Sequence, residues 1–306
     1  MRALSLNPVL PFLLDNQPDT IAALKPMLKY RGGKSKELPF LTPWFPKDFN
    51  TYFEPFFGGG AVYFHLHPAR AVLNDINPRL MDFYRTVRDD YSALRRQLDE
   101  LERIYAQNQS EYARKKAQSP ENRVEDANEA LYYRLRDMYN GKAPSAYLPA
   151  VTYFFINKTA YSGMIRYNAD GEYNVPFGRY QHFNTQLITE EHHRLLQGAT
   201  LRSEDFSTIF PLATSDDFMF LDPPYDCIFN DYGNLSQQEG FSETEHQRLR
   251  KAFGALKCKA VMVIGKTPLT ERLYQGLIRD EYFKSYAVNI RNRFKSEAKH
   301  IIITNF

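Results

Sequence analysis

The chain has 306 residues, 43% of them hydrophobic, and a formal net charge of only +3. It is long enough for a full core in one or two domains, and any nucleic-acid partner would have to meet a local basic face. Cys227 and Cys258 lack the spacing of a disulfide framework or a cysteine-rich metal site, so we expect no metal. No apolar stretch approaches the ~18 residues of a membrane span, which predicts a soluble, cytoplasmic protein without membrane contact.

Short apolar runs that end in polar or turn residues predict buried strands of an α/β sheet, whose carboxyl ends usually bind ligands. Such runs occupy residues 71–73, 218–221, 260–264 and 301–303. Between about 78 and 147, apolar residues recur at helical spacing among charged ones and predict helices; examples are Leu94, Leu98, Leu101 and Ile104. The segment 157–180 is rich in Tyr, Asn, Gly and Arg and predicts an ordered loop or hairpin.

The simplest domain layout is an α/β core split by an insertion. We expect the core to comprise residues 1–78 and 187–306, and the mainly helical insertion to comprise 79–186. The polar, aromatic end of the insertion has the character of a recognition surface. Residues 1–25 form an N-terminal extension to which we assign no role.

A glycine-rich block, FEPFFGGG at residues 53–60, predicts a turn after a strand where the backbone approaches a ligand closely. A helix beginning near Ala61 would present free N–H groups to that ligand. The block is no nicotinamide fingerprint, because Tyr63 stands where a third glycine is required. The next strand ends in Asp75, which could accept both hydroxyls of a ribose, although an aspartate at this place alone is more often a helix cap.

Two lysine motifs, RGGKS at 31–35 and GKT at 265–267, resemble part of a phosphate-binding loop. The first glycine of that loop is missing in both, since Leu28 and Ala260 occupy its place. The sequence therefore argues against a nucleoside triphosphatase.

The strand at 218–221 is followed by Asp222, Pro223, Pro224 and Tyr225. An exocyclic amine of a nucleobase is a poor nucleophile because its lone pair is delocalised, so a site that alkylates it needs hydrogen-bond acceptors for both N–H groups. The Asp222 carboxylate and the Pro223 carbonyl would be those acceptors, since the two prolines restrict φ and orient the carbonyl. The ring of Tyr225 would stack on the base. A strand merely ended by prolines is the alternative.

Five blocks together resemble, in the same order, the Dam-type DNA adenine-N6 methyltransferases: KYRGGK at 29–34, FEPFFGGG at 53–60, LNDIN at 73–77, GMIRYNADGEYNVPFGRY at 163–180 and DPPY at 222–225. The resemblance covers roughly residues 28–306. It implies S-adenosyl-L-methionine as methyl donor, a Rossmann-like, S-adenosylmethionine-dependent methyltransferase fold with a mixed seven-stranded sheet, and a target-recognition domain in the insertion. It also implies double-stranded DNA as partner, a monomer or weak dimer, and a bacterial or phage-encoded origin.

The resemblance assigns site residues by matched position. Around the donor it places Tyr30, Lys34, Phe56, Gly58, Asp75, Asp205, Phe206 and Asp222, with Asp75 on the ribose and Asp205 and Phe206 at the adenine. On DNA it places Lys29, Tyr161, Met164, Arg166, Asn168, Pro176 and Tyr180, most of which match positions that read GATC. The chemistry agrees, because arginine bonds guanine bidentately and apolar side chains meet the thymine methyl.

The catalytic hypothesis is therefore a base-flipping adenine-N6 methyltransferase in which residues 226–241 order over the flipped base. The chain departs from the family where Val263 to Lys266 replace a more usual Ser-Asn pair, and in its longer helical insertion. Two alternatives stay open: another amino-methyltransferase, acting on cytosine N4 or on RNA, and an inactive DNA-binding homologue.

Overall fold

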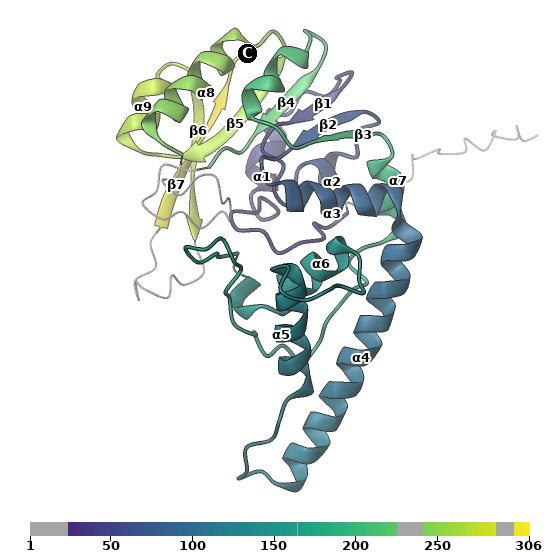
Figure 1. Ribbon diagram of the computed structural model, residues 1–306. Coiled ribbons are helices and arrows are strands. Elements are labelled where there is room, and N and C mark those ends of the chain that lie inside the picture. The colour runs from purple at the N-terminus through teal and green to yellow at the C-terminus, as the bar shows by residue number, and fades with distance from the viewer. Residues whose placement is uncertain (1–23, 164, 225–240, 286–296) are drawn as a thin grey trace, which may run out of the picture.

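The computed structural model describes residues 24–163, 165–224, 241–285 and 297–306 (Figure 1). Within them, strands form one seven-stranded sheet of order β3-β2-β1-β4-β5-β7-β6. The strands are β1 (Tyr52–Glu54), β2 (Ala71–Asn74), β3 (Ala199–Arg202), β4 (Phe218–Leu221), β5 (Lys259–Gly265), β6 (Ile278–Ser285) and β7 (Glu297–Thr304). Strands β1 to β5 are parallel, and β7 is antiparallel to both β5 and β6. The mixed sheet confirms the predicted fold class.

All four apolar runs predicted as strands lie in the sheet, as β2, β4, β5 and β7. Side chains alternate between the two faces of a strand, so Phe218 and Phe220 join one hydrophobic cluster while Met219 and Leu221 join the other. Apolar runs do not mark β3 and β6, because their sequences ATLR and IRDEYFKS mix polar and apolar residues.

Helices cover both faces of the sheet. One cluster of apolar side chains joins the sheet to α1 (Leu38–Leu41), η1 (Thr42–Trp44), α2 (Tyr63–Leu66), α3 (Pro78–Asp89) and α7 (Glu190–Leu196). The other joins it to η3 (Phe206–Thr208), η4 (Phe210–Leu212), α8 (Glu243–Ala255) and α9 (Pro268–Leu273). The central strands are therefore covered on both sides, as parallel sheets require.

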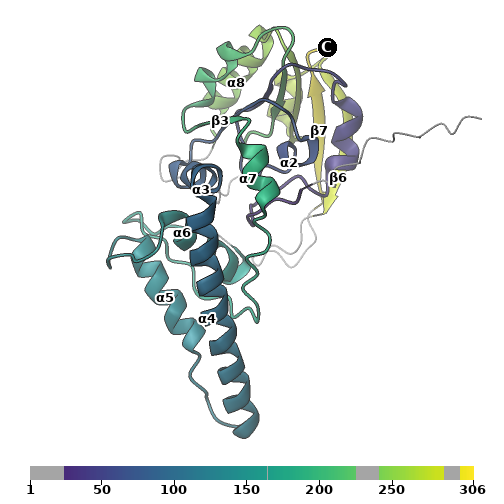
Figure 2. The ribbon, with the colours of Figure 1, turned by 90° about the vertical axis from the view of Figure 1, so that its right-hand side faces the viewer.

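The inserted helices extend away from the sheet (Figure 2). They are α4 (Tyr91–Gln118), α5 (Ala127–Tyr139) and α6 (Pro149–Thr159), followed by the single turn η2 (Tyr161–Gly163). The predicted leucine spacing forms the buried stripe of α4, with Leu94, Leu98 and Leu101 fully buried. No helix of the described residues is long and apolar enough to cross a membrane.

The segment predicted to be loop or hairpin from residue 157 onward is helical up to Thr159, so this boundary was wrong by three residues (157–159). The last ten residues of α6 are all buried, which carries Asn157, Lys158 and Thr159 into the interior. A helix is favoured in this buried segment, because a helix pairs the backbone N–H and C=O groups that a loop would leave unsatisfied. The Thr159 hydroxyl also donates to the Phe155 carbonyl at 2.6 Å.

Candidate active site

A cavity of about 360 Å³ opens where the carboxyl ends of four parallel strands meet. Its walls come from the glycine turn after β1 (residues 55–60), from Asp75 after β2, from residues 204–206 after β3 and from residues 222–224 after β4. The strand order reverses between β1 and β4, and open α/β sheets bind ligands at such a reversal. The fold therefore gathers sequence motifs that are far apart along the chain.

Asn74, the last residue of β2, ties three of these walls together. Its side-chain amide donates to the carbonyls of Pro55 and Glu204, both at 3.0 Å, and accepts from the Glu204 N–H at 2.9 Å. The side chain thus satisfies backbone groups that loops at the end of a sheet would leave unpaired. Sequence reasoning missed Asn74, whose only signal was its place beside Asp75.

Asp75 is buried on the floor of the cavity. Its Oδ2 accepts the Gly58 N–H and its Oδ1 accepts the Asn77 N–H, each at 2.9 Å. Burial raises the pKa of the carboxyl to about 6, and the two hydrogen bonds limit the rise. The N-cap of α3 is Asn77, whose side chain accepts from the Leu80 N–H. The helix-cap interpretation of Asp75 is therefore wrong.

The glycine turn packs directly against Tyr30. Gly58 has a φ of +50°, and a Cβ added to it would lie 2.8 Å from Cε1 of Tyr30. Any side chain at this position would displace the ring, which forms part of the cavity wall. The helix predicted to begin near Ala61 begins at Tyr63 and has only four residues, because His67 takes a left-handed φ of 49° and ends it.

Lys34 and Asp222 form an ion pair inside the cavity. The Nζ atom of Lys34 lies 2.6 Å from Oδ2 of Asp222 and donates to the Gly32 carbonyl at 2.8 Å. The lysine is only 3% exposed. Burial raises the pKa of Asp222, and the lysine charge opposes that rise. Lys34, expected beside the donor, therefore also contacts the proposed acceptor of the amine.

Glu54, the last residue of β1, is another carboxyl group in the cavity wall and was not predicted as a site residue. It is 3% exposed and accepts the Tyr52 hydroxyl at 2.8 Å. Burial raises its pKa well above the ordinary range, and the negative charge of Asp222 adds to the rise. Burial therefore favours the protonated form of Glu54. The position of Glu54 directly before Pro55 and the glycine turn was the sequence signal that could have marked it as a site residue.

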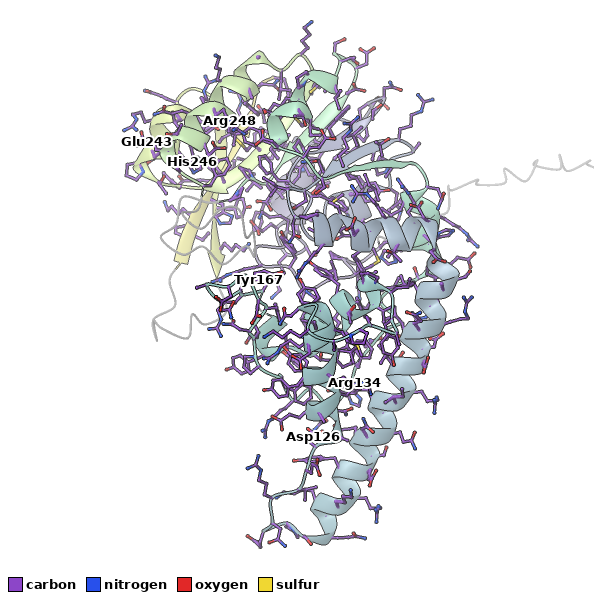
Figure 3. All side chains as sticks on the ribbon, viewed as in Figure 1. Asp126, Arg134, Tyr167, Glu243, His246 and Arg248 are labelled. Atoms are coloured by element: carbon purple, nitrogen blue, oxygen red, sulfur yellow. The ribbon has the colours of Figure 1, made fainter. Side chains whose placement is uncertain are left out.

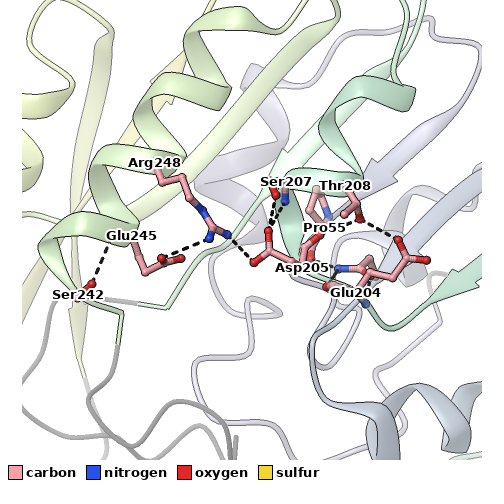
Figure 4. Close-up of polar contacts among 9 residues, drawn as sticks. Pro55, Glu204, Asp205, Ser207, Thr208, Ser242, Glu245 and Arg248 are labelled. Carbon is pink, nitrogen blue, oxygen red and sulfur yellow. Dashed lines mark hydrogen bonds and ion pairs between the residues drawn. The ribbon is translucent and has the colours of Figure 1, made fainter.

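Asp205 and Phe206 form the wall after β3. Asp205 accepts from the backbone and hydroxyl of Ser207 and pairs with Arg248 of α8 (Figure 4). Although burial raises the pKa of Asp205, these hydrogen bonds lower it below its usual value. The Arg248 guanidinium also lies 4.4 Å from the ring centroid of Phe206. The Phe206 ring packs in turn against Phe56 of the glycine turn after β1.

Apart from Lys29, the predicted DNA-contacting residues that the structure describes lie in the segment 161–180, which forms a hairpin after α6. The Tyr161 N–H donates to the Pro176 carbonyl at 2.9 Å, and the two arms also pair between Tyr167 and Tyr173. Tyr161, Arg166 and Pro176 are exposed. Arg166 donates from Nε to Asn174 at 2.9 Å. Figure 3 shows Tyr167 where the insertion approaches the sheet, with Arg134 and Asp126 farther along it.

Asn168 closes the turn of this hairpin. Its Oδ1 accepts the N–H groups of Asp170 and Glu172 at 3.1 and 2.8 Å. The side chain is half-buried, so in this structure it organises the hairpin, while its predicted contact with DNA stays a prediction.

Lys29 connects the hairpin to the cavity. Its backbone N–H and carbonyl both bond the Asn157 side chain at 2.8 Å, and its Nζ lies 3.8 Å from the ring centroid of Tyr180. Lys29 also lines the cavity. The predicted DNA-contacting and donor-binding residues thus form adjoining surfaces. Met164, Tyr225 and residues 226–240 lie outside the described residues, whereas Phe241 lines the cavity beside Phe206.

The mixed sheet with its cavity at the carboxyl ends of β1 to β4 is that of an S-adenosylmethionine-dependent methyltransferase fold. The family model of D12 class N6 adenine-specific DNA methyltransferases matches residues 30–290, and the chain belongs to this family. It is an adenine-specific DNA methyltransferase. This membership decides against the cytosine-N4 and RNA alternatives.

Curated relatives cover nearly the whole chain. The chain is 33% identical to the type II methyltransferase M.CviBI of Paramecium bursaria Chlorella virus NC1A, over 92% of this chain and 100% of the relative. It is 27% identical to the type II methyltransferase M.MjaIII of Methanocaldococcus jannaschii, over 92% and 99%. It is 26% identical to the DNA adenine methylase of Haemophilus influenzae, over 82% and 83%.

The raised pKa of Glu54 predicts how stability depends on pH. Its pKa is raised in the folded state, so the stability it contributes is present below the ordinary glutamate range of about pH 4 to 5 and is lost as pH rises. Glu54→Gln, which mimics the protonated form, should therefore gain stability relative to the wild type as pH rises above about 5. Urea unfolding across this range measures the difference. A difference that stays constant with pH would contradict the assignment.

Proposed function

We propose that the chain binds S-adenosyl-L-methionine in the cavity and methylates N6 of an adenine flipped out of double-stranded DNA. The observation that carries this proposal is that Asp75 and Asp222 line one cavity together with the glycine turn. The volume of about 360 Å³ falls in the range of small-molecule sites, roughly 300–1,000 Å³. When bound, the donor supplies a methyl group that its positive sulfonium makes electrophilic.

The cavity residues suit the parts of this donor. Asp75 presents a carboxylate that can accept ribose hydroxyls, at the end of the second strand where such a group is expected. Phe206 offers an aromatic wall and Asp205 an acceptor for an adenine amine. Tyr30, Phe56 and Gly58 close the remaining wall around the glycine turn. This agreement supports the predicted donor-binding set.

Asp222 and the carbonyl of Pro223 would accept the two N–H groups of the target amine. Two such acceptors hold the nitrogen lone pair out of conjugation with the base and stabilise the positive charge that develops on nitrogen. The Lys34 charge favours the ionised form of Asp222, because it opposes the effect of burial on the pKa. Pro224 helps to orient the backbone.

We propose base flipping because N6 of an adenine that is stacked in the duplex cannot reach the interior of a cavity of this kind. The exposed Tyr161 would fill the gap left in the duplex, and Lys29, which lines the cavity and contacts Tyr180, would lie beside the entering base. We propose that the target-recognition domain is the insertion 79–186. We also propose that the site contains GATC, because Lys29, Met164, Arg166, Pro176 and Tyr180 match GATC-reading positions.

Asp222→Asn tests the catalytic role. The amide keeps an oxygen for Lys34 but removes the negative charge, so we expect kcat to fall about 10²- to 10³-fold. Donor binding should remain measurable. Turnover with tritiated S-adenosylmethionine and duplex DNA, with calorimetry for donor binding, provides the measurement. Near-normal kcat in this variant would refute the role of Asp222, and a wild-type chain that binds the donor and DNA without turnover would indicate an inactive homologue.

The pKa of Asp75 predicts the pH dependence of donor binding. Ribose hydroxyls bond the ionised carboxylate best, so binding should lower the Asp75 pKa and weaken as pH falls through about 6. Since about one-tenth of a group with this pKa is ionised at pH 5, affinity should be about tenfold lower there than at pH 7. Calorimetric titration at several pH values measures it. Asp75→Asn should bind the donor weakly at every pH. If donor binding by this variant depended equally steeply on pH, the effect would belong to another titrating group.

Arg166 tests the proposed recognition sequence. If its guanidinium bonds guanine bidentately, Arg166→Ala should lose about 1–3 kcal/mol on GATC and far less on a duplex altered at that guanine. Arg134 is an exposed arginine on α5. The variant Arg134→Ala is the matched control and should discriminate between the two duplexes as the wild type does. Mapping every methyladenine in a plasmid made with active enzyme gives the site directly. Methylation confined to sequences without GATC would overturn this assignment and leave the adenine methyltransferase activity intact.

A further inference from the structure

A buried cluster of charged side chains lies behind the Lys34–Asp222 ion pair and was not singled out by any motif. Its centre is Glu37, the N-cap residue of α1, which is 3% exposed. The Glu37 carboxylate receives hydrogen bonds from Tyr282 Oη, Lys284 Nζ and His300 Nδ1, the last at 2.8 Å. In Figure 2, helix α1, in purple, lies beside β6 and β7.

The hairpin formed by β6 and β7 is what brings three donors to one carboxylate. Tyr282 and Lys284 are two residues apart on β6 and therefore share a face. His300 of β7 is the register partner of Tyr282, so it lies on that face too. The ring of Phe40 in α1 stacks on Tyr282, with centroids 4.7 Å apart and planes 4° from parallel. This packing fixes α1 against the hairpin.

Glu37 is coupled to the active-site lysine through one turn of backbone. The Glu37 N–H donates to the Lys34 carbonyl at 2.8 Å, and the Leu38 N–H bonds the same carbonyl at 3.1 Å. Although burial would raise the pKa of Glu37, His300, Lys34, Lys284 and Tyr282 together lower it to about 2. Glu37 is thus a permanent negative charge beside Lys34, and charges alternate in sign along Asp222, Lys34, Glu37 and Lys284.

We propose that Glu37, held by the β6–β7 hairpin, is a positioning residue that fixes Lys34 and, through it, the carboxylate of Asp222 for the amine of the target base. The inference rests on the proposed catalytic role of Asp222. It assigns a function to the antiparallel end of the sheet, which contributes no side chain of its described residues to the cavity wall. A buried charge cluster is weak evidence for stability alone, because desolvation offsets much of the attraction.

The electrostatic signs make the proposal testable. The charged groups that act on Asp222 include Lys34 in the loop before α1, Glu37 at the N-cap of α1 and Lys284 on β6, while Asp222 in turn acts on Glu54 of β1. His300 of β7 reaches this set through Glu37. Glu37 raises the pKa of Asp222, and Lys284 lowers it. Removing the Glu37 charge should therefore lower the pKa of Asp222, and removing the Lys284 charge should raise it.

The experiment compares Glu37→Gln with Lys284→Met in the donor-free full-length chain. Asp222 is followed through its ¹³C-labelled carboxyl by NMR, assigned by its loss in Asp222→Asn. We expect the Asp222 midpoint to fall in Glu37→Gln and to rise in Lys284→Met. Glu281→Gln is the matched control, because Glu281 pairs on the opposite face of β6 with Lys266 and Lys299 and should leave the midpoint unchanged.

Turnover provides the second readout. Glu37→Gln should lower kcat about tenfold or more, since a shift of about 1 Å in a catalytic group can cost up to 10²-fold, with the KM values for donor and DNA changed less than twofold. Midpoints that do not move, or that move in the same direction, would overturn the proposal. If Glu37→Gln does not fold, Lys284→Met still tests the coupling, because loss of the lysine charge should raise the Asp222 midpoint and an unchanged midpoint would overturn the proposal. If the wild type does not methylate DNA but the midpoints shift as expected, the proposed function fails and the electrostatic coupling stands.

Discussion

The ion pair between the buried Lys34 and the partly buried Asp222 is the interaction on which the site depends. It joins residues 188 positions apart, one in the loop before α1 and one directly after β4. Breaking one partner of a buried pair leaves an uncompensated charge that typically costs about 3–5 kcal/mol. The loop that carries Tyr30 and Lys34 is therefore anchored to the end of β4, and the cavity wall and the carboxylate at its centre cannot be placed independently.

Three of the carboxyl groups that line this cavity differ because their surroundings differ. Glu54 is buried with a tyrosine hydroxyl and has a raised pKa, Asp75 has two backbone N–H donors and a pKa of about 6, and Asp222 has a lysine. Separate environments are how one site assigns different roles to the same chemical group. The proposed acceptor for an amine, the proposed acceptor for ribose hydroxyls and a carboxyl group whose protonated form is favoured by burial can thus coexist within a few residues of the sheet edge.

The proposed DNA-recognition hairpin and the proposed catalytic cavity are joined by a short set of contacts. Asn157 of α6 pairs with both backbone groups of Lys29 much as a neighbouring strand would, and Lys29 then reaches the ring of Tyr180. The hairpin that carries Tyr161 and Arg166 begins directly after α6. A base that leaves a duplex held on this hairpin would therefore enter the cavity beside Lys29. The extent of the insertion as a recognition domain is part of the proposal.

Local sequence patterns are enough to predict several parts of this protein. Continuous apolar runs predicted β4 and β5, leucine spacing predicted α4, and carboxylates at strand ends predicted Asp75 and Asp222 in one site. The partners of the buried polar groups, in contrast, are known only from the folded chain. Asn74 bridges loops that are far apart in the chain, and Glu37 meets Tyr282 and His300 across 245 and 263 positions. The polar strand β6 and the buried end of α6 likewise had no local signal. Such features arise because buried charges and backbone groups must find partners wherever the fold places them, and neither spacing nor propensity carries that information.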